Sequence, residues 1–157
     1  MGSQSKIDLA YIAGFLDGDG SLMLQIKKRK DGNKSRKRFM VTICFYQDSR
    51  HEKPLYWIRN ILNIGYVSRR NDGITELRIN GYKQIEKILQ NLFPFIKFKK
   101  IQAKILLASV QLLQKSKLTE KELKRLVNNI LKIQSENYVT KRKKKKKELL
   151  KILGLTP

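Results

Sequence analysis

The spacing of hydrophobic positions changes abruptly near residue 20. Over 9–18 apolar and small residues recur at helical spacing, whereas from Ser21 onward apolar and polar residues alternate. This change of period predicts a helix that leads directly into a half-buried strand. Asp8 is expected to cap the helix at its start, and Gly18 and Gly20 are expected to end it. The inward positions of the strand are Leu22, Leu24 and Ile26.

The same patterns predict the remaining elements. Alternation resumes over 38–46, which indicates a second strand, and the charged segment 28–37 between the two strands favours a loop. Helical spacing at 52–64 is followed by a hairpin over 66–80. Further helices are expected over 82–93, 99–114 and 119–137. The order α-β-β-α-β-β-α, with extra C-terminal helices, is typical of an α+β domain.

A single domain accounts for the length of 157 residues. We place it at 7–138, and we expect 139–157 to form a basic C-terminal tail with one short helical turn, because 141–147 is nearly all lysine. The sequence has no apolar run of the length that crosses a bilayer, and its first residues lack the apolar core of a secretory signal. We therefore predict no membrane association.

Charge narrows the choice of partner. The chain has 35 Lys and Arg against 13 Asp and Glu, which gives a formal net charge of +22. A protein this basic repels itself unless a polyanion neutralises it, so nucleic acid is the expected partner and a small-molecule substrate is not. A basic structural or ribosomal protein is the alternative that charge alone leaves open. The one cysteine, Cys44, forms no internal disulfide, which favours an intracellular, reducing compartment.

The helix over 9–18 carries small residues at every fourth position. Such a ridge lets a second helix approach closely, and the chain contains one copy of this motif. The partner helix is therefore expected from a second chain, in a two-fold symmetric homodimer. The interface residues that we predict are Ala10, Ala13, Gly14, Asp17 and Gly18.

Two carboxylates, Asp17 and Asp19, stand at the C-terminal end of this helix. A negative charge there opposes the helix dipole at a cost of about 0.3–1 kcal/mol, and a bound cation would reverse the sign. The two side chains lie about 200° apart around a helix, so both cannot point into one site. A simple turn or a calcium loop is the alternative for an Asp-Gly-Asp-Gly run.

The segment Leu9-Ala-Tyr-Ile-Ala-Gly-Phe-Leu-Asp-Gly-Asp-Gly-Ser21 resembles the signature of the LAGLIDADG homing endonucleases. Further matches, to the single-motif, homodimeric branch of that family, fall at 39–47, 65–67 and 92–103. The resemblance implies the α+β LAGLIDADG fold, in which an antiparallel sheet forms a saddle for DNA. It also implies an enzyme that makes double-strand breaks in DNA by metal-dependent hydrolysis.

The resemblance assigns roles to particular side chains. Asp19 would bind the metal with help from the Gly18 carbonyl; Mg²⁺ is the expected ion, and Mn²⁺ or Ca²⁺ could occupy the same site. Lys99 would stabilise negative charge on the phosphate, and Gln47 would organise water. His51 stands where the family carries an arginine, and the arginine just before it is an alternative for that role. One histidine and one cysteine exclude zinc-finger and His-Cys chemistry.

The outward faces of the two predicted hairpins are basic and polar. Their donors, acceptors and flat side chains suit the edges of bases in the major groove, and their sulfur-bearing side chains suit thymine methyl groups. A solvated sheet face is the alternative. The DNA-contacting residues that we predict are Gln25, Lys27, Arg29, Arg38, Met40, Thr42, Cys44, Tyr46, Ser68, Arg70 and Arg78.

Together these features predict a homodimeric, site-specific, intron-encoded DNA endonuclease. The resemblance implies a long, roughly palindromic target that is cleaved across the minor groove to leave short 3′ overhangs. The alternative is a catalytically silent binder on the same fold, either an RNA maturase that aids intron splicing or a DNA-binding regulator. An organelle and a prokaryotic cytoplasm are equally compatible locations.

Overall fold

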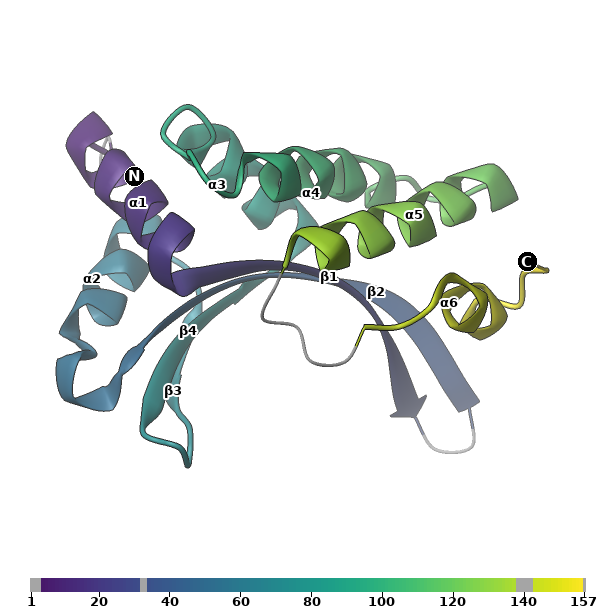
Figure 1. The fold of residues 1–157 in the computed structure, drawn as a ribbon, viewed down its shortest axis with the longest axis horizontal. Helices are drawn as coiled ribbons and strands as arrows, with labels where there is room; N and C mark the ends of the chain where they lie inside the picture. The colour runs from purple at the N-terminus through teal and green to yellow at the C-terminus, as the bar shows by residue number, and fades with distance from the viewer. Residues whose placement is uncertain (1–3, 32–33, 138–142, 157) are drawn as a thin grey trace.

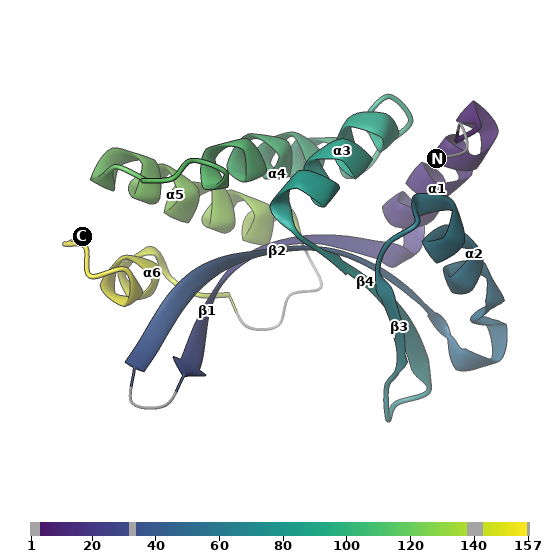
Figure 2. The ribbon, with the colours of Figure 1, turned by 180° about the vertical axis from the view of Figure 1, so that it is seen from behind.

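A curved, four-stranded antiparallel sheet with helices on its convex side forms the body of the protein (Figure 1). The computed structural model describes residues 4–31, 34–137 and 143–156. In the sheet the order is β1 (Gly20–Asp31), β2 (Lys34–Asp48), β4 (Ile74–Asn80) and β3 (Tyr66–Arg69). Within these described residues, no helix lies on the concave side when the molecule is seen from the front or from behind (Figures 1 and 2). The α+β class and the predicted order of elements are confirmed.

Helix α1 (Lys6–Asp19) contains the small-residue ridge. Its N-cap is Ser5, whose Oγ accepts a hydrogen bond from the Asp8 backbone N–H at 3.0 Å. The predicted Asp8 cap was wrong, because Asp8 is the third helical residue and supplies the N–H that needs an acceptor. The helix also continues through Gly18, and Asp19 is followed at once by β1.

The β1–β2 hairpin is longer than predicted. The segment 28–37 was expected to be a loop, but residues 28–31 continue β1 and residues 34–37 begin β2, with Lys28 opposite Lys37. Both of these lysines are exposed. Water and salt screen the repulsion between exposed charges, so a run of lysines does not by itself end a strand.

The second half of the sheet follows the prediction closely. A single 3-10 turn, η1 (Ser49–His51), connects β2 to α2 (Lys53–Leu62). Strands β3 and β4 then pair antiparallel, and Gly73 adopts a φ of 80° in the turn between them. A positive φ is costly for residues with a Cβ atom, which explains glycine at this position.

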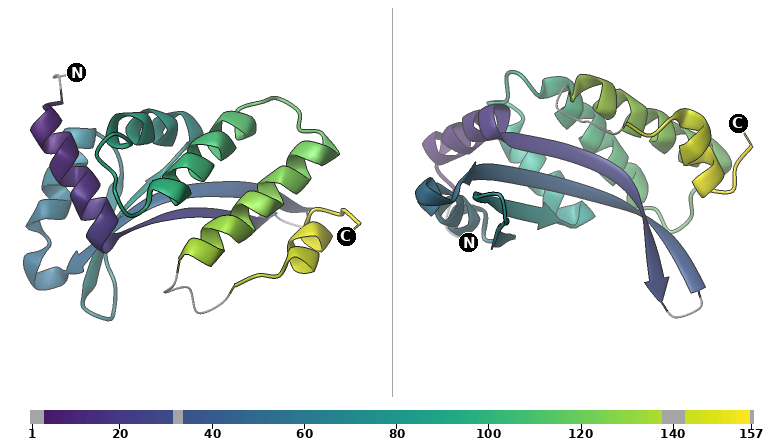
Figure 3. Two further views of the ribbon diagram at one scale, coloured as in Figure 1. Left: turned by 45° about the horizontal axis from the view of Figure 1, so that its top comes forward. Right: turned by 60° about the horizontal axis from the view of Figure 1, so that its bottom comes forward.

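Helices α3 (Tyr82–Leu92), α4 (Lys100–Leu113) and α5 (Glu120–Glu136) cover the convex side of the sheet (Figure 3). The predicted capping box at the start of α5 is confirmed: Thr119 Oγ1 accepts from the Glu122 backbone N–H, and the Glu122 carboxylate accepts from the Thr119 N–H. Hydrogen bonds at both ends of this box satisfy backbone donors that the helix itself leaves unpaired.

The C-terminal segment contributes α6 (Lys146–Ile152), which packs against α5. Leu149 and Leu150 are buried in the same hydrophobic core as the rest of the chain, whereas the lysines of 143–147 are exposed. The predicted boundary at 138/139 falls within residues 138–142, which lie outside the described part, so the division into domain and tail stays a prediction.

One hydrophobic core lies between the sheet and the helices. Alternate residues of β1 and β2 point into it, as predicted, and α1 adds Ile12 and Leu16. Burial of these side chains stabilises the fold. The described side chains on the opposite face of the sheet are not part of this core. Over residues 4–31, 34–137 and 143–156, none of the helices combines the length and the apolar character of a membrane-crossing segment.

Candidate active site and nucleic-acid interface

Two of the predicted site residues, Asp19 and Lys99, lie where α1 ends, and a third, Gln47, is on the neighbouring strand. Asp19 is the last residue of the helix, and it is exposed. In β2, Phe45 is paired with Gly20, the residue after Asp19, and Gln47 lies two residues further along the strand. The Lys99 Nζ donates a hydrogen bond to the carbonyl oxygen of Asp17 at 2.5 Å, which brings this amine next to the helix end as well. A carboxylate and an amine from distant parts of the chain thus lie at one helix end, and the amide lies on the strand that pairs with the residue after the helix.

The surroundings of Lys99 lower the pKa of its amine. Burial lowers the pKa of its amine, and the negative charges of Asp17 and Asp19 act in the opposite direction. The side chain is half-buried at the start of α4, which limits the positions that the amine can reach. Lys99 therefore offers a compact positive charge at a defined place beside Asp19.

Gln47 and His51 flank the end of β2. The Gln47 Oε1 accepts a hydrogen bond from the Asp48 backbone N–H at 2.9 Å, so its nitrogen is the atom that can donate toward a water molecule. His51 is exposed at the end of η1. Arg50, the alternative for the family arginine, is already paired with Asp48 through its Nε at 3.0 Å and its Nη2 at 2.8 Å. This pairing holds the pKa of Asp48 well below its usual range.

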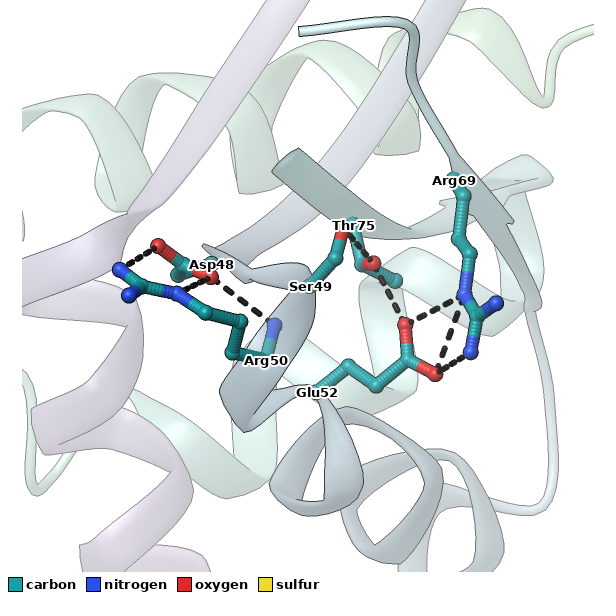
Figure 4. Close-up of polar contacts among 6 residues, drawn as sticks. All are labelled: Asp48, Ser49, Arg50, Glu52, Arg69 and Thr75. Atoms are coloured by element: carbon teal, nitrogen blue, oxygen red, sulfur yellow. Dashed lines mark hydrogen bonds and ion pairs between the residues drawn. The ribbon is translucent and has the colours of Figure 1, made fainter. Parts of the chain in front are cut away.

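A second polar network holds the β2–α2 connection in place (Figure 4). The Glu52 carboxylate accepts from the Arg69 guanidinium and from Thr75 Oγ1, the latter at 2.6 Å. Ser49 bonds to the same threonine hydroxyl at 2.8 Å. Glu52 thereby ties the segment that carries Gln47 and His51 to the β3–β4 hairpin.

Acid should weaken this tie. The Arg69 and Thr75 bonds lower the pKa of Glu52 to about 2. A carboxyl whose pKa is lower in the folded state stabilises the fold fully above its ordinary pKa, and that contribution disappears as pH falls toward 2. We expect Glu52→Gln to lower the melting temperature at pH 6 and to have progressively less effect between pH 4.5 and pH 2.

Thermal unfolding followed by circular dichroism across this pH range tests the expectation. Glu120→Gln is a matched control, since Glu120 pairs with Lys124 on the surface of α5, away from this network. A difference between the Glu52→Gln and native proteins that stays constant down to pH 2 would contradict the proposed role of the carboxylate.

The predicted dimer face of α1 divides into two sets. Ala10, Gly14 and Gly18 are exposed and lie on one side of the helix, and a Cβ atom added at either glycine would have no atom within 4 Å. Ala13 and Asp17 are buried within the chain, so their assignment to a partner contact was wrong. Adjacent positions on a helix differ by 100°, which turns Ala13 away from the side that Gly14 occupies.

Large apolar side chains lie exposed near this ridge. Ile7 is 82% exposed, and Tyr11 makes an edge-to-face contact with Trp57 of α2 at a centroid distance of 5.4 Å. Phe98, the residue before Lys99, is 84% exposed. Exposed apolar groups of this size mark a surface that another molecule can cover.

Apart from Arg29 and Arg70, the predicted DNA-contacting residues share the concave face of the sheet. Cross-strand pairs place Gln25 with Met40, Lys27 with Arg38, and Cys44 with Arg78. Side chains that oppose each other across an antiparallel pair point to the same face. Ser68 of β3 points to this face opposite Glu76, and Arg70 follows β3, where it pairs with Asp72. Arg29 lies in β1, but its side chain is outside the described part of the structure.

Two of these predictions are contradicted. Thr42 and Cys44 point to the concave face, but both are 0% exposed. Thr42 Oγ1 donates to Asn80 Oδ1 at 2.7 Å, and Cys44 Sγ lies 4.0 Å from Glu76 Oε2. Neighbouring strands cover both side chains, so neither can contact a base. Burial also raises the pKa of the Cys44 thiol to about 11, which leaves it unreactive.

Residues that the sequence analysis missed complete this face. Glu76 is almost buried in the middle of the basic surface, where its carboxylate accepts from Arg78 Nε at 2.8 Å. Ser21 shares a hydrogen bond of 3.0 Å with the Tyr46 hydroxyl. Burial raises the pKa of Tyr46 to about 12, so this phenol stays protonated. The alternation that identified Arg78 could have identified Glu76, which is two residues earlier on the same strand.

The donor set suits a shared cation rather than a site within one chain. Among the described residues, no group of three His, Cys, Asp or Glu side chains comes together. Asp19 is exposed, and the last carbonyl groups of α1, Gly18 included, lack helical partners. Mg²⁺ is commonly held by one or two carboxylates together with water and phosphate oxygens. The residues present therefore fit a hard divalent ion once a second copy and a phosphate are added.

A comparison with protein families settles the classification. The family described as LAGLIDADG endonuclease matches residues 12–108, which include the end of α1, the sheet, and Lys99. The chain belongs to the LAGLIDADG endonuclease family. Among LAGLIDADG proteins, the DNA endonuclease I-CvuI of Chlorella vulgaris is 31% identical over 112 residues, 71% of this chain and 69% of the relative. The DNA endonuclease I-CreI of Chlamydomonas reinhardtii is 30% identical over 113 residues, 72% of this chain and 68% of the relative.

Solved LAGLIDADG structures support the same classification. I-CvuI in complex with the I-CreI target DNA, in the presence of Mg, superimposes with a TM-score of 0.83 at 28% identity, covering 97% of this chain and 98% of that one. The archaeal intron-encoded I-Vdi141I, complexed with DNA, has a TM-score of 0.78 at 21% identity over 94% of this chain and 95% of that one, and shares the LAGLIDADG fold.

Proposed function

We propose that this LAGLIDADG protein is a homodimeric, site-specific DNA endonuclease that depends on a divalent metal ion, with Mg²⁺ as the physiological ion. The observation that carries the proposal is the position of Asp19. It is an exposed carboxylate at a helix end that disfavours negative charge, beside Lys99, on the helix with the exposed small-residue ridge. Family membership and two DNA endonucleases at about 30% identity support the same activity.

The chain's own residues divide the work of hydrolysis. Asp19 and the Gly18 carbonyl would hold the ion, which would polarise the phosphate and acidify the attacking water. Lys99 would neutralise charge that develops on the phosphate, since its amine is already held beside Asp19. Gln47 would orient water through its free amide nitrogen, and His51 would take the outer position near the phosphate.

Two copies would be needed for a double-strand break. Contact through Ala10, Gly14 and Gly18 would bring both helix ends together, so that each Asp19 serves one DNA strand. The two concave faces would then lie side by side as one saddle in the major groove. A two-fold symmetric protein matches a long, roughly palindromic target, cleaved across the minor groove to short 3′ overhangs.

The alternative is a protein that binds nucleic acid without cleaving it. The replacement of the family arginine by His51, with Arg50 held by Asp48, favours this alternative. The presence of Asp19, Gln47 and Lys99 favours the enzyme, because a protein that only binds nucleic acid needs no carboxylate that opposes the helix dipole. We further propose an intron-encoded origin and an intracellular, reducing location, in an organelle or a prokaryotic cytoplasm.

Selection of cleaved duplexes from a randomised plasmid library tests the proposal. The native protein should convert a selected supercoiled plasmid into linear product with Mg²⁺ and should leave it intact with EDTA. Binding to the same duplex should weaken steeply between 50 and 200 mM salt, about 10³-fold or more, because many phosphate contacts release counterions. Tight, sequence-specific binding without linear product in any divalent ion would instead support the silent binder.

A further inference from the structure

Asp17 is a buried carboxylate that the proposed hydrolysis does not use. The residue is 8% exposed, and both oxygens of its side chain are occupied. Oδ2 accepts from the backbone N–H groups of Lys97 at 2.6 Å and Phe98 at 3.2 Å, and Oδ1 accepts from the N–H of Lys99 at 3.0 Å. Backbone donors thus engage both oxygens of Asp17, whereas the Asp19 carboxylate is exposed.

These three bonds join segments that are 80–82 residues apart in the chain. They hold the three residues that come directly before α4, where unpaired backbone N–H groups and the positive end of the helix dipole both favour a negative charge. Bonds from backbone N–H groups to an ionised carboxylate are about twice as strong as neutral ones. The start of α4 is therefore held firmly against the end of α1.

The contact is reciprocal at Lys99. Its backbone N–H donates to the Asp17 side chain, and its Nζ donates to the Asp17 main-chain oxygen at 2.5 Å. Lys99 is thus held at its backbone and at the tip of its side chain by one residue of α1. Asp17 is two positions before Asp19 on α1. The same helix therefore holds both the Lys99 amine and the exposed Asp19 carboxylate.

We propose that Asp17 is a positioning residue: its carboxylate fixes the segment 97–99 so that the Lys99 amine stands at a set distance from the Asp19 carboxylate. The inference rests on the proposed endonuclease function. A displacement of about 1 Å at a reacting centre can cost about 100-fold in rate, so an anchor of this kind acts on catalysis without touching the substrate. The competing explanation is that Asp17 merely stabilises the fold.

The variant that separates the two explanations is Asp17→Asn. An asparagine keeps one acceptor oxygen and presents an NH₂ group to a backbone N–H, so it cannot hold all three amides. We expect kcat for a selected DNA duplex to fall about 10- to 100-fold while KM changes less than about threefold. Asp8→Asn, the same chemical change in the first turn of the same helix, should leave both constants unchanged.

A double-mutant cycle with Lys99→Ala measures whether Asp17 acts on the rate through Lys99. If Asp17 acts through Lys99, Asp17→Asn should reduce the rate of the Lys99→Ala protein less than about threefold, since the group that it positions is gone. An equal fold-loss in both backgrounds, or a loss that appears only in KM, would overturn the proposal. Asp17→Glu keeps both acceptors but adds a methylene group, and it should lose less kcat than Asp17→Asn; native kcat in both variants would also overturn it.

Hydrogen exchange separates this inference from the proposed function. Backbone amides of 97–99 should exchange faster in Asp17→Asn than in the native protein, whereas those of α5 should not change. Unchanged exchange at 97–99 would overturn the anchor even in an active enzyme. A native protein that cleaves no duplex of the library would overturn the proposed function and the catalytic part of this inference. Faster exchange at 97–99 in Asp17→Asn would then leave Asp17 as a structural anchor only.

Discussion

Replacement of Asp19 by asparagine should abolish DNA cleavage and leave DNA binding intact. The amide is a poor ligand for a hard divalent ion, so the variant loses the group that would place the ion on the phosphate. We expect cleavage of a selected duplex to slow by about 10³-fold or more, a loss as large as that of a key electrostatic group in other enzymes. Binding in Ca²⁺, measured by gel shift, should stay within about threefold of native.

The same substitution should make the metal-free chain slightly more stable. The carboxylate stands at the C-terminal end of α1, where negative charge opposes the helix dipole, so its removal should raise the free energy of unfolding by a few tenths of a kcal/mol. Asp8→Asn, at the opposite end of the helix, should have the reverse effect on stability and none on cleavage. If the chain were a basic structural protein, the native form would not cleave DNA, and neither the substitution nor the divalent ion would change this.

Replacement of Gly14 by glutamine should separate the proposed dimer into stable monomers. A Cβ atom at Gly14 meets no atom within 4 Å, so the larger side chain fits the single chain. Glutamine also forms helix better than glycine, and the monomer should gain about 0.5–1 kcal/mol. Between two closely packed helices the same side chain costs about 1–3 kcal/mol per chain, which should raise the dimer dissociation constant about 30-fold or more.

Sedimentation equilibrium and cleavage assays on the same sample test this expectation. Double-strand cleavage should fall with the dimer fraction, since one chain presents one Asp19. Asn128→Gln, an exposed position on α5 with similar chemistry, should change neither the assembly nor the cleavage rate. A Gly14→Gln protein that remains a dimer and cuts both strands at the native rate would contradict the helix-to-helix arrangement.

The elements of the fold could be predicted because they depend on neighbours along the chain. The period of apolar residues in 20–26 and 38–46, the capping box at Thr119, and the turn before β4 all reside in a few consecutive residues. The exceptions were also local. Ser5 rather than Asp8 caps α1. Residues 28–31 and 34–37 are strand, because pairing between β1 and β2 outweighs the weak preference of exposed charged residues for loops.

The candidate site was predicted in its composition but not in its connections. The signature helix and the matching spacing identified Asp19, Gln47 and Lys99, and the structure places Lys99 at the helix end that carries Asp19. No pattern near Asp17 indicates that its partners are the amides of 97–99, because those lie some 80 residues away. The burial of Ala13 followed from helical phase and could have been foreseen.

The concave face also shows which features the sequence predicts and which depend on tertiary packing. Alternation along each strand correctly places Thr42, Cys44 and Arg78 on one side of the sheet, since side-chain direction is a property of the strand itself. Whether such a side chain is accessible depends on what the adjacent strand sets beside it, and here Asn80 and Glu76 close over two of the three. Periodicity therefore determines which way a residue points, and packing between segments distant in the chain determines what it can touch.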